Sequence, residues 1–207
     1  MNDAPLAIAR IRDALAAAPS QQVEDATRPR AAVAVVLREG ADGPELLLIE
    51  RAKHPEDPWS GHMAFPGGRV DPGDADPQSA AERETLEEVG LSLVGAELLG
   101  RLDDIEGRQG GRKLSLVISA HVYHCADPGE LVLNHEVAAA LWVPLARLHD
   151  AAYHVEYATP YGGYPGILVG EPERHVVWGL TYRFLEIFLA ALGRPLPQRW
   201  VRGESGS

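Results

Sequence analysis

Residues 67–91 decide the fold, and they read Gly-Gly-Arg-Val-Asp-Pro-Gly-Asp-Ala-Asp-Pro-Gln-Ser-Ala-Ala-Glu-Arg-Glu-Thr-Leu-Glu-Glu-Val-Gly-Leu. The stretch from Gln78 to Val89 is rich in Ala, Glu, Arg and Leu, which favours a helix. Gly90 follows it in the position of a C-terminal glycine cap. The residues before the helix contain Gly, Pro and Asp and predict a loop. We therefore expect a glycine turn, a loop and an acidic helix in direct succession.

Three glutamates of this helix point in similar directions. A helix turns by 100° per residue, so Glu84, Glu87 and Glu88 share an arc of roughly 100° on one face. Leu86 and Val89 are expected to point the other way, toward a core. Carboxylates this close repel one another unless cations compensate. Such hard oxygen ligands suit Mg²⁺ or Mn²⁺.

The simpler interpretation of an acidic helix is a solvated surface. Two features favour a metal site instead. Gly67 and Gly68 allow the backbone to approach the acidic face closely. Arg83 can hold a neighbouring carboxylate with two hydrogen bonds and fix its orientation.

The rest of the chain predicts a mixed α/β layered domain. A short amphipathic helix is expected within 5–18 and a polar linker over 18–30, followed by a hairpin of strands 31–37 and 45–51. A closing helix is expected from about His175 to Leu192. Further strands are predicted at 61–65, 93–102, 114–125, 140–143, 153–157 and 166–169. We divide the chain into an N-terminal helix and linker (1–30), a main domain (31–195) and a tail (196–207).

Composition narrows the classes of function. The chain has 207 residues, with 19 Lys and Arg against 30 Asp and Glu, and a formal net charge of −11. A field of that sign repels phosphate backbones and anionic lipids, so we expect neither nucleic acid nor a membrane as a partner. The single cysteine, Cys125, cannot form an internal disulfide, and the first residues do not look like a signal peptide. We expect a cytoplasmic protein.

The motif resembles the signature of the Nudix hydrolases: Gly, five residues, an acid, seven residues, then Arg-Glu, an apolar residue, any residue, Glu-Glu, any residue, Gly and an apolar residue. It departs from that signature at three points: Asp74 replaces a glutamate, eight residues separate Asp74 from Arg83, and Thr85 occupies an apolar position. The residues that match are Gly68, Arg83, Glu84, Glu87, Glu88, Gly90 and Leu91.

The resemblance implies an α/β/α sandwich with a mixed central sheet. It also implies metal-dependent hydrolysis of a nucleoside diphosphate linked to another moiety. Glu84, Glu87, Glu88 and the Gly68 carbonyl would bind Mg²⁺ or Mn²⁺, while Arg83 would position these acids. The general base comes either from the motif helix or from a later loop, where Glu136 is the candidate. The resemblance is compatible with a homodimer, which no residue specifies.

The substrate class is open at this point. Residues 47–52 and 61–68 are similar to an extra motif of the coenzyme A diphosphatase branch, which makes Arg51, Phe65 and Gly67 candidates for substrate binding. This branch usually has an arginine near positions 56–57, where Glu56 and Asp57 stand here. We expect coenzyme A or an acyl derivative, with ADP-ribose, NADH or oxidised nucleotides as the alternative and a non-catalytic nucleotide sensor as a third option. Aromatic residues that can stack on adenine are Trp59, Tyr161 and Tyr164.

Overall fold

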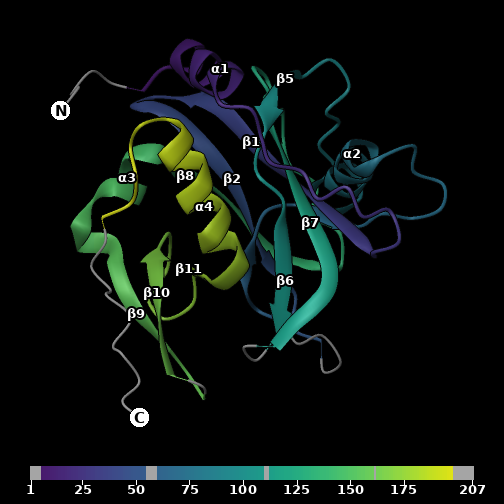
Figure 1. Cartoon of the computed structure of the whole chain (residues 1–207). Coiled ribbons are helices and arrows are strands. Elements are labelled where there is room, and N and C mark those ends of the chain that lie inside the picture. Colours follow the sequence, from purple (N-terminus) through teal and green to yellow (C-terminus); the bar gives the residue numbers. More distant parts are fainter. Residues whose placement is uncertain (1–5, 55–59, 110–111, 161, 198–207) are drawn as a thin grey trace.

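A computed structural model describes residues 6–54, 60–109, 112–160 and 162–197. A mixed sheet forms its centre, with helices on both faces (Figure 1). The strands of this sheet are β1 (Arg30–Gly40), β2 (Gly43–Arg51), β3 (Met63–Ala64), β4 (Gly67–Arg69), β5 (Glu97–Arg101), β6 (Ile105–Gln109), β7 (Arg112–His124) and β8 (Val137–Pro144). The main order is β3-β2-β1-β7-β5, and β4, β6 and β8 pair with β1, β7 and β2. The expected α/β/α sandwich is confirmed.

One strand pair makes the sheet mixed. β1 runs parallel to β7 from Arg30 to Leu37, whereas it runs antiparallel to β2. The expected hairpin of β1 and β2 is therefore present. β7 is not adjacent to β1 in the sequence, so hydrophobic patterning alone does not reveal that these two strands pair.

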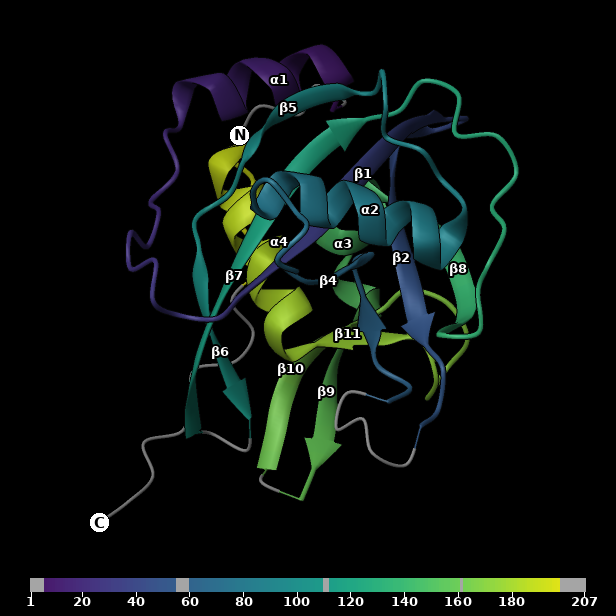
Figure 2. The ribbon, with the colours of Figure 1, turned by 90° about the vertical axis from the view of Figure 1, so that its right-hand side faces the viewer.

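Each face of the sheet is covered by its own helices. Helix α2 (Pro77–Val89) lies on one face, and α4 (Gly179–Ala191) lies on the other (Figures 1 and 2). Helix α1 (Ile8–Ala17) joins the α4 side. It buries Ile8, Ile11 and Leu15 in the same core as α4, so the N-terminal helix shares the core of the main domain.

A three-stranded sheet and a short helix complete the fold. The antiparallel strands are β9 (His154–Thr159), β10 (Gly162–Leu168) and β11 (Val176–Trp178). They follow α3 (Leu145–His149) and a 3₁₀ turn (Ala151–Tyr153). Within the described ranges, every helix is too short or too polar to cross a bilayer.

Several element predictions are corrected. The closing helix begins at Gly179 rather than at His175, because Val176–Trp178 pairs with β10 as a strand. The apolar spacing continues through this strand, so the helix and the strand look alike in sequence. The strand predicted at 93–102 is shorter in the structure, where β5 spans only Glu97–Arg101. The elements β4, β6 and α3 were not predicted.

Helix α2 has well-defined ends. The Asp76 carboxylate accepts a hydrogen bond from the Ser79 N–H (2.8 Å), and the Ser79 hydroxyl accepts one from the Asp76 N–H (3.0 Å). Gly90 ends the helix with φ 70°, as its cap position predicts. Val89 is buried as expected, but Leu86 is 51% exposed, which corrects its predicted core position. The core side of α2 is formed instead by small residues, including Ala81, which lets the helix lie close to the sheet.

We expect Asp76→Ala to lower the free energy of unfolding by about 1 kcal/mol, because it leaves the first-turn N–H groups of α2 without their acceptor. Urea denaturation of the variant and the parent protein measures this difference. The control is Asp13→Ala, which removes an exposed carboxylate from α1 and should change stability by no more than about 0.5 kcal/mol. Equal effects of the two substitutions would contradict the capping role.

Candidate active site

The candidate site lies where the central sheet opens. β1 pairs with β2 only at Leu37–Gly40, while its first residues pair with β4. The end of β2 pairs instead with β3. The segment from β3 to β4 therefore fills the opening between two strands, beneath α2 (Figure 2). The glycine turn and the acidic helix meet at this point.

Glu88 joins the glycine turn to the helix. Its side chain accepts a hydrogen bond from the Gly67 N–H at 2.8 Å, and the residue is only 2% exposed. The pKa of Glu88 is raised to about 7, chiefly by burial; the Gly67 N–H and Arg51 lower it, while the neighbouring carboxylates of Glu84 and Glu136 raise it. Sequence reasoning placed this glutamate on an acidic face, but the structure shows it enclosed.

Gly67 permits this arrangement. Its φ is 147°, and a Cβ there would overlap the carbonyl oxygen of Ala32 and the Cα of Val33 on β1. Only glycine combines that conformation with such a close approach.

Gly68 lies against Glu84 in a similar way. A Cβ at Gly68 would overlap the Glu84 carboxylate, so this carboxylate occupies the space that a side chain would need. Burial raises the pKa of Glu84, and Glu87 and Glu136 add to the shift, while Arg83 opposes it.

Arg83 forms hydrogen bonds with three of the acidic side chains around it. Its guanidinium donates two hydrogen bonds to Asp74, at 3.0 Å each. It also donates to Glu84 at 3.0 Å and to Glu87 at 3.2 Å. Pairing with Asp74 raises the pKa of Arg83 and lowers that of Asp74. The shorter aspartate and the extra residue before Arg83 therefore do not prevent this pairing.

The donor set fits a divalent cation in its chemistry. Four carboxylates lie close enough to influence one another, those of Glu84, Glu87, Glu88 and Glu136, and the pKa values of Glu84 and Glu88 are both raised. A divalent cation would relieve this repulsion. Among the described residues, no three His, Cys, Asp or Glu side chains already converge as a metal centre. Arg83 bonds to one carboxylate oxygen of Glu84 and one of Glu87, so the second oxygen of each can bind a metal while Arg83 holds the first.

The predicted substrate contacts divide between the two faces. Alternation along β2 places Arg51 on the α2 side of the sheet, near Glu88. Phe65 is 3% exposed and packs in the core on the α4 side, so it holds a packing position rather than a ligand contact. Glu136 is exposed, and its carbonyl accepts a hydrogen bond from the Ala52 N–H at 2.7 Å, which ties its loop to the end of β2.

An aromatic cluster beside the site was largely missed. The ring of Trp178 contacts those of His62, Tyr157 and Tyr164. Of these, only Tyr164 was a candidate, because the rings come from three strands and the residue before β3, which sequence spacing does not connect. The other two stacking candidates, Trp59 and Tyr161, lie outside the described residues.

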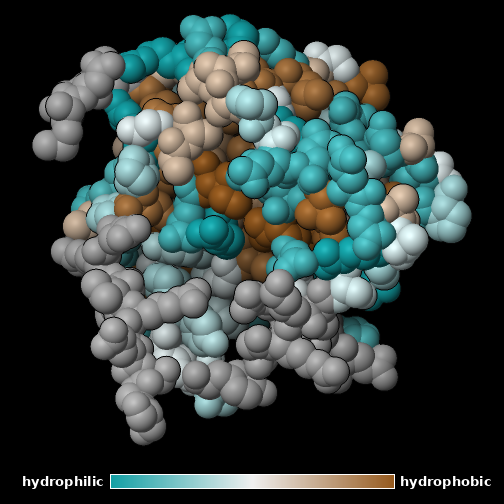
Figure 3. Space-filling view, in the orientation of Figure 1, coloured by the Kyte–Doolittle hydropathy of each residue, from teal (hydrophilic) through white to brown (hydrophobic). Residues whose placement is uncertain are grey.

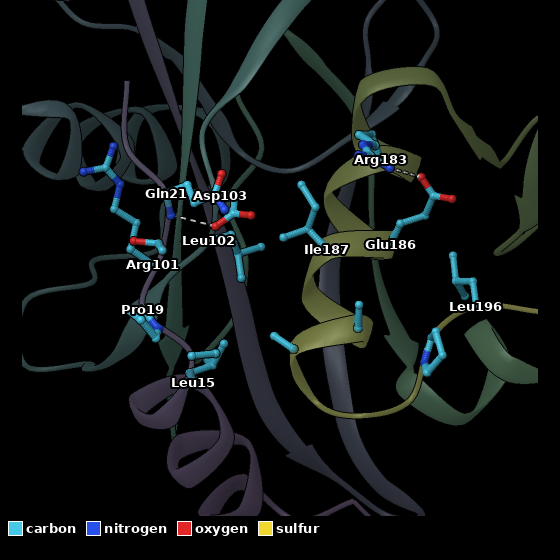
Figure 4. Close-up of a pocket in the computed structure, with 15 residues that line it drawn as sticks. Leu15, Pro19, Gln21, Arg101, Leu102, Asp103, Arg183, Glu186, Ile187 and Leu196 are labelled. Carbon is cyan, nitrogen blue, oxygen red and sulfur yellow. Dashed lines mark hydrogen bonds and ion pairs between the residues drawn. The ribbon is translucent and has the colours of Figure 1, made fainter. Parts of the chain in front are cut away.

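A large groove occurs elsewhere on the molecule. It has a volume of about 450 Å³ and lies between the end of α1, the β5–β6 connection and α4 (Figure 4). Its apolar lining includes Leu15, Leu102 and Ile187, and apolar residues gather near the centre of the face seen in Figure 3. The charged groups Arg183 and Glu186 pair with each other at 3.1 Å. The groove lies on the α4 side, opposite the acidic cluster.

Comparison with known proteins identifies a NUDIX domain in this chain. The NUDIX domain model matches residues 27–161. The Nudix hydrolase NudL of Escherichia coli K12 is 32% identical over 142 residues, which cover 67% of this chain and 70% of that protein. An uncharacterized protein of Schizosaccharomyces pombe is 40% identical over 109 residues, or 51% of this chain, and this match spans only 33% of the yeast protein.

A solved structure supports the fold alone. The MutT/nudix family protein of Enterococcus faecalis superposes with a TM-score of 0.55 and 17% identity, covering 91% of this chain and 70% of that one.

We expect Gly67→Ala to lower the free energy of unfolding by at least about 2 kcal/mol, because the added methyl meets β1 and the backbone conformation disfavours a side chain. Gly73→Ala is the matched control, since a Cβ there meets nothing within 4 Å. Chemical denaturation should show the control within about 0.5 kcal/mol of the parent. A similar loss in both variants would show that the approach of Gly67 to β1 is not what constrains the turn.

Proposed function

The chain belongs to the Nudix hydrolase family, which acts on pyrophosphate bonds, and from this premise we propose that it hydrolyses the diphosphate of a nucleoside diphosphate linked to another moiety. The observation that supports this proposal most strongly is the acidic cluster against the glycine turn. Glu84 and Glu88 have raised pKa values at a point where the backbone of Gly67 and Gly68 leaves no room for side chains. Such a site suits a divalent cation and a diphosphate better than it suits pure packing.

The proposed roles follow from the contacts. Glu84, Glu87 and Glu88, with the Gly68 carbonyl, would hold Mg²⁺ or Mn²⁺. When bound, the cation supplies charge neutralisation for the diphosphate and lowers the pKa of a bound water. Arg83 positions Glu84 and Glu87 through the hydrogen bonds described above.

Glu136 is proposed as the general base. Its carboxylate interacts with those of Glu84 and Glu88 and it is exposed, so it can reach a water molecule at the cluster. The water oxygen would bond to phosphorus while a bond from phosphorus to the bridging oxygen breaks. Glu136 would accept the proton.

For the substrate, we propose coenzyme A or an acyl-coenzyme A, which would give 3′,5′-ADP and a 4′-phosphopantetheine. The similarity of residues 47–52 and 61–68 to the coenzyme A diphosphatase branch supports this choice. The arginine usual in that branch is absent, but the Lys53 side chain lies beside Gly61, within 4 Å of the position that a Cβ would take there. We propose that Lys53 supplies the cation for the additional 3′-phosphate.

We expect Glu88→Gln to reduce kcat by at least about 100-fold while the protein stays folded, because the amide keeps the hydrogen bond from Gly67 but loses the charge. Release of the two phosphorylated products with Mg²⁺ or Mn²⁺ measures turnover. Glu82→Gln is the matched control. Glu82 lies on the same helix, and its side chain accepts a hydrogen bond from the Tyr123 hydroxyl, so this variant should keep near-parental turnover. An unchanged kcat in folded Glu88→Gln would contradict the proposed site.

Mass spectrometry of reactions with coenzyme A, ADP-ribose, NADH and oxidised nucleotides should identify 3′,5′-ADP and 4′-phosphopantetheine as the favoured products. Lys53→Met should raise KM for coenzyme A about five-fold or more and leave KM for dephospho-coenzyme A unchanged, since only the former carries the 3′-phosphate. Preferential cleavage of another conjugate would reject coenzyme A, and binding without cleavage of any would favour a sensor.

A further inference from the structure

The small sheet beside the candidate site has two different faces. One face turns inward, where Ile167 and Val177 are fully buried in the core with α4. Alternation along the strands places Tyr157, Tyr164 and Trp178 together on the other face. Residues of all three strands therefore contribute to one aromatic surface.

The rings on that surface contact one another closely. Trp178 stacks on Tyr157 with centroids 4.6 Å apart and an angle of 19° between the planes. Tyr164 is tilted toward Trp178 at 5.7 Å, and His62 meets it edge to face at 4.8 Å. All four residues are only partly buried, so part of each remains accessible to solvent.

The composition of this face is unusual for a solvated sheet. The outer face of an antiparallel sheet is normally polar, and a contiguous apolar surface indicates a binding site. Gly166 lies opposite Trp178 in the register, and a Cβ there would meet the side chains of Val176 and Tyr157. The absence of that side chain lets Trp178 and Tyr157 approach across the middle strand.

The aromatic surface is connected directly to the proposed catalytic site. The Arg51 N–H donates to the His62 carbonyl at 3.0 Å, so His62 is fixed to the end of β2 that carries Arg51. β3 follows His62 immediately and leads to Gly67 within five residues. β11 contacts β3, and Figure 2 shows the small sheet beyond the ends of β2 and β4. A nucleotide conjugate bound at the acidic cluster can therefore extend across these rings.

We propose that Tyr157, Trp178 and Tyr164, with His62 at their edge, form a stacking platform for the nucleobase of the substrate. Aromatic side chains bind bases through their ring faces with little dependence on sequence or hydrogen-bond pattern. The inference rests on the proposed function, because it assigns the base-binding part of the same site. It places base recognition on strands rather than on the acidic helix.

The test compares AMP with ribose 5-phosphate, which carries the same phosphate and lacks the base. We expect AMP to quench tryptophan fluorescence and ribose 5-phosphate at the same concentration to have no effect. Trp178→Phe should abolish the quenching, whereas Trp142→Phe should retain it, because Trp142 stacks instead with Arg38. Both measurements need no turnover, so they can fail or succeed independently of the proposed hydrolysis.

Isothermal titration calorimetry of the ring variants then measures how much each ring contributes to AMP binding. Tyr157→Leu should weaken AMP binding about 5- to 100-fold, and Tyr157→Phe should restore it. Tyr153→Leu is the matched control, since the Tyr153 ring packs against Arg147 and should not affect AMP. If thermal melting shows that Tyr157→Leu does not fold, Tyr164→Leu replaces it.

Three results would contradict the proposed stacking platform. These are equal affinity of the parent protein for AMP and ribose 5-phosphate, unchanged AMP binding in a folded Tyr157→Leu or Tyr164→Leu variant, and no measurable binding of AMP. The last result together with normal hydrolysis of a nucleotide conjugate would place the base elsewhere without affecting the proposed reaction.

Discussion

The hydrogen bond from the Gly67 N–H to the Glu88 carboxylate holds the candidate site together. It joins a loop inserted in the sheet to a helix lying above it, and it is one of few partners for a carboxylate that is almost completely buried. Burying a carboxyl group with so little compensation costs stability, and the raised pKa expresses that cost. Such a position is expected where function rather than packing selects the residue. The glycine turn, the split of the sheet and the close approach to β1 are all required to place this one N–H.

A second buried glutamate, Glu50, has its charge compensated in a different way. Glu50 on β2 is 5% exposed and faces the α4 side, next to Arg51, which faces the acidic cluster. Arg174 donates hydrogen bonds to both Glu50 carboxylate oxygens, which lowers the pKa of Glu50. One carboxylate is thus fully paired and stabilises its charged form, whereas Glu88, across the sheet, has its charged form disfavoured. The two faces therefore differ in electrostatics as well as in the helices that cover them.

Local patterns predicted the parts of the site that are continuous in sequence. The α2 boundaries, the Gly90 cap and the β1–β2 hairpin all depend on short-range spacing, and the structure confirms each. Contacts between distant segments were not. The enclosure of Glu88 and the exposure of Leu86 depend on how closely α2 approaches the sheet, and the core position of Phe65 depends on its packing on the α4 side. Residue periodicity specifies neither. The sequence predicts a helix at Val176–Trp178, where the structure has a strand, because an apolar run suits either element until its partner is known.

The contacts of Arg83 bear on how the protein reaches its folded state. An acidic helix would ordinarily resist formation until a metal neutralises it, and in many small metalloproteins folding waits for the ion. Here an arginine within the helix already bonds to Asp74, Glu84 and Glu87. The chain therefore carries its own counterion, and the architecture of the site can assemble during synthesis whatever the supply of divalent cations in the cell. Metal supply would then govern activity without governing the amount of folded protein.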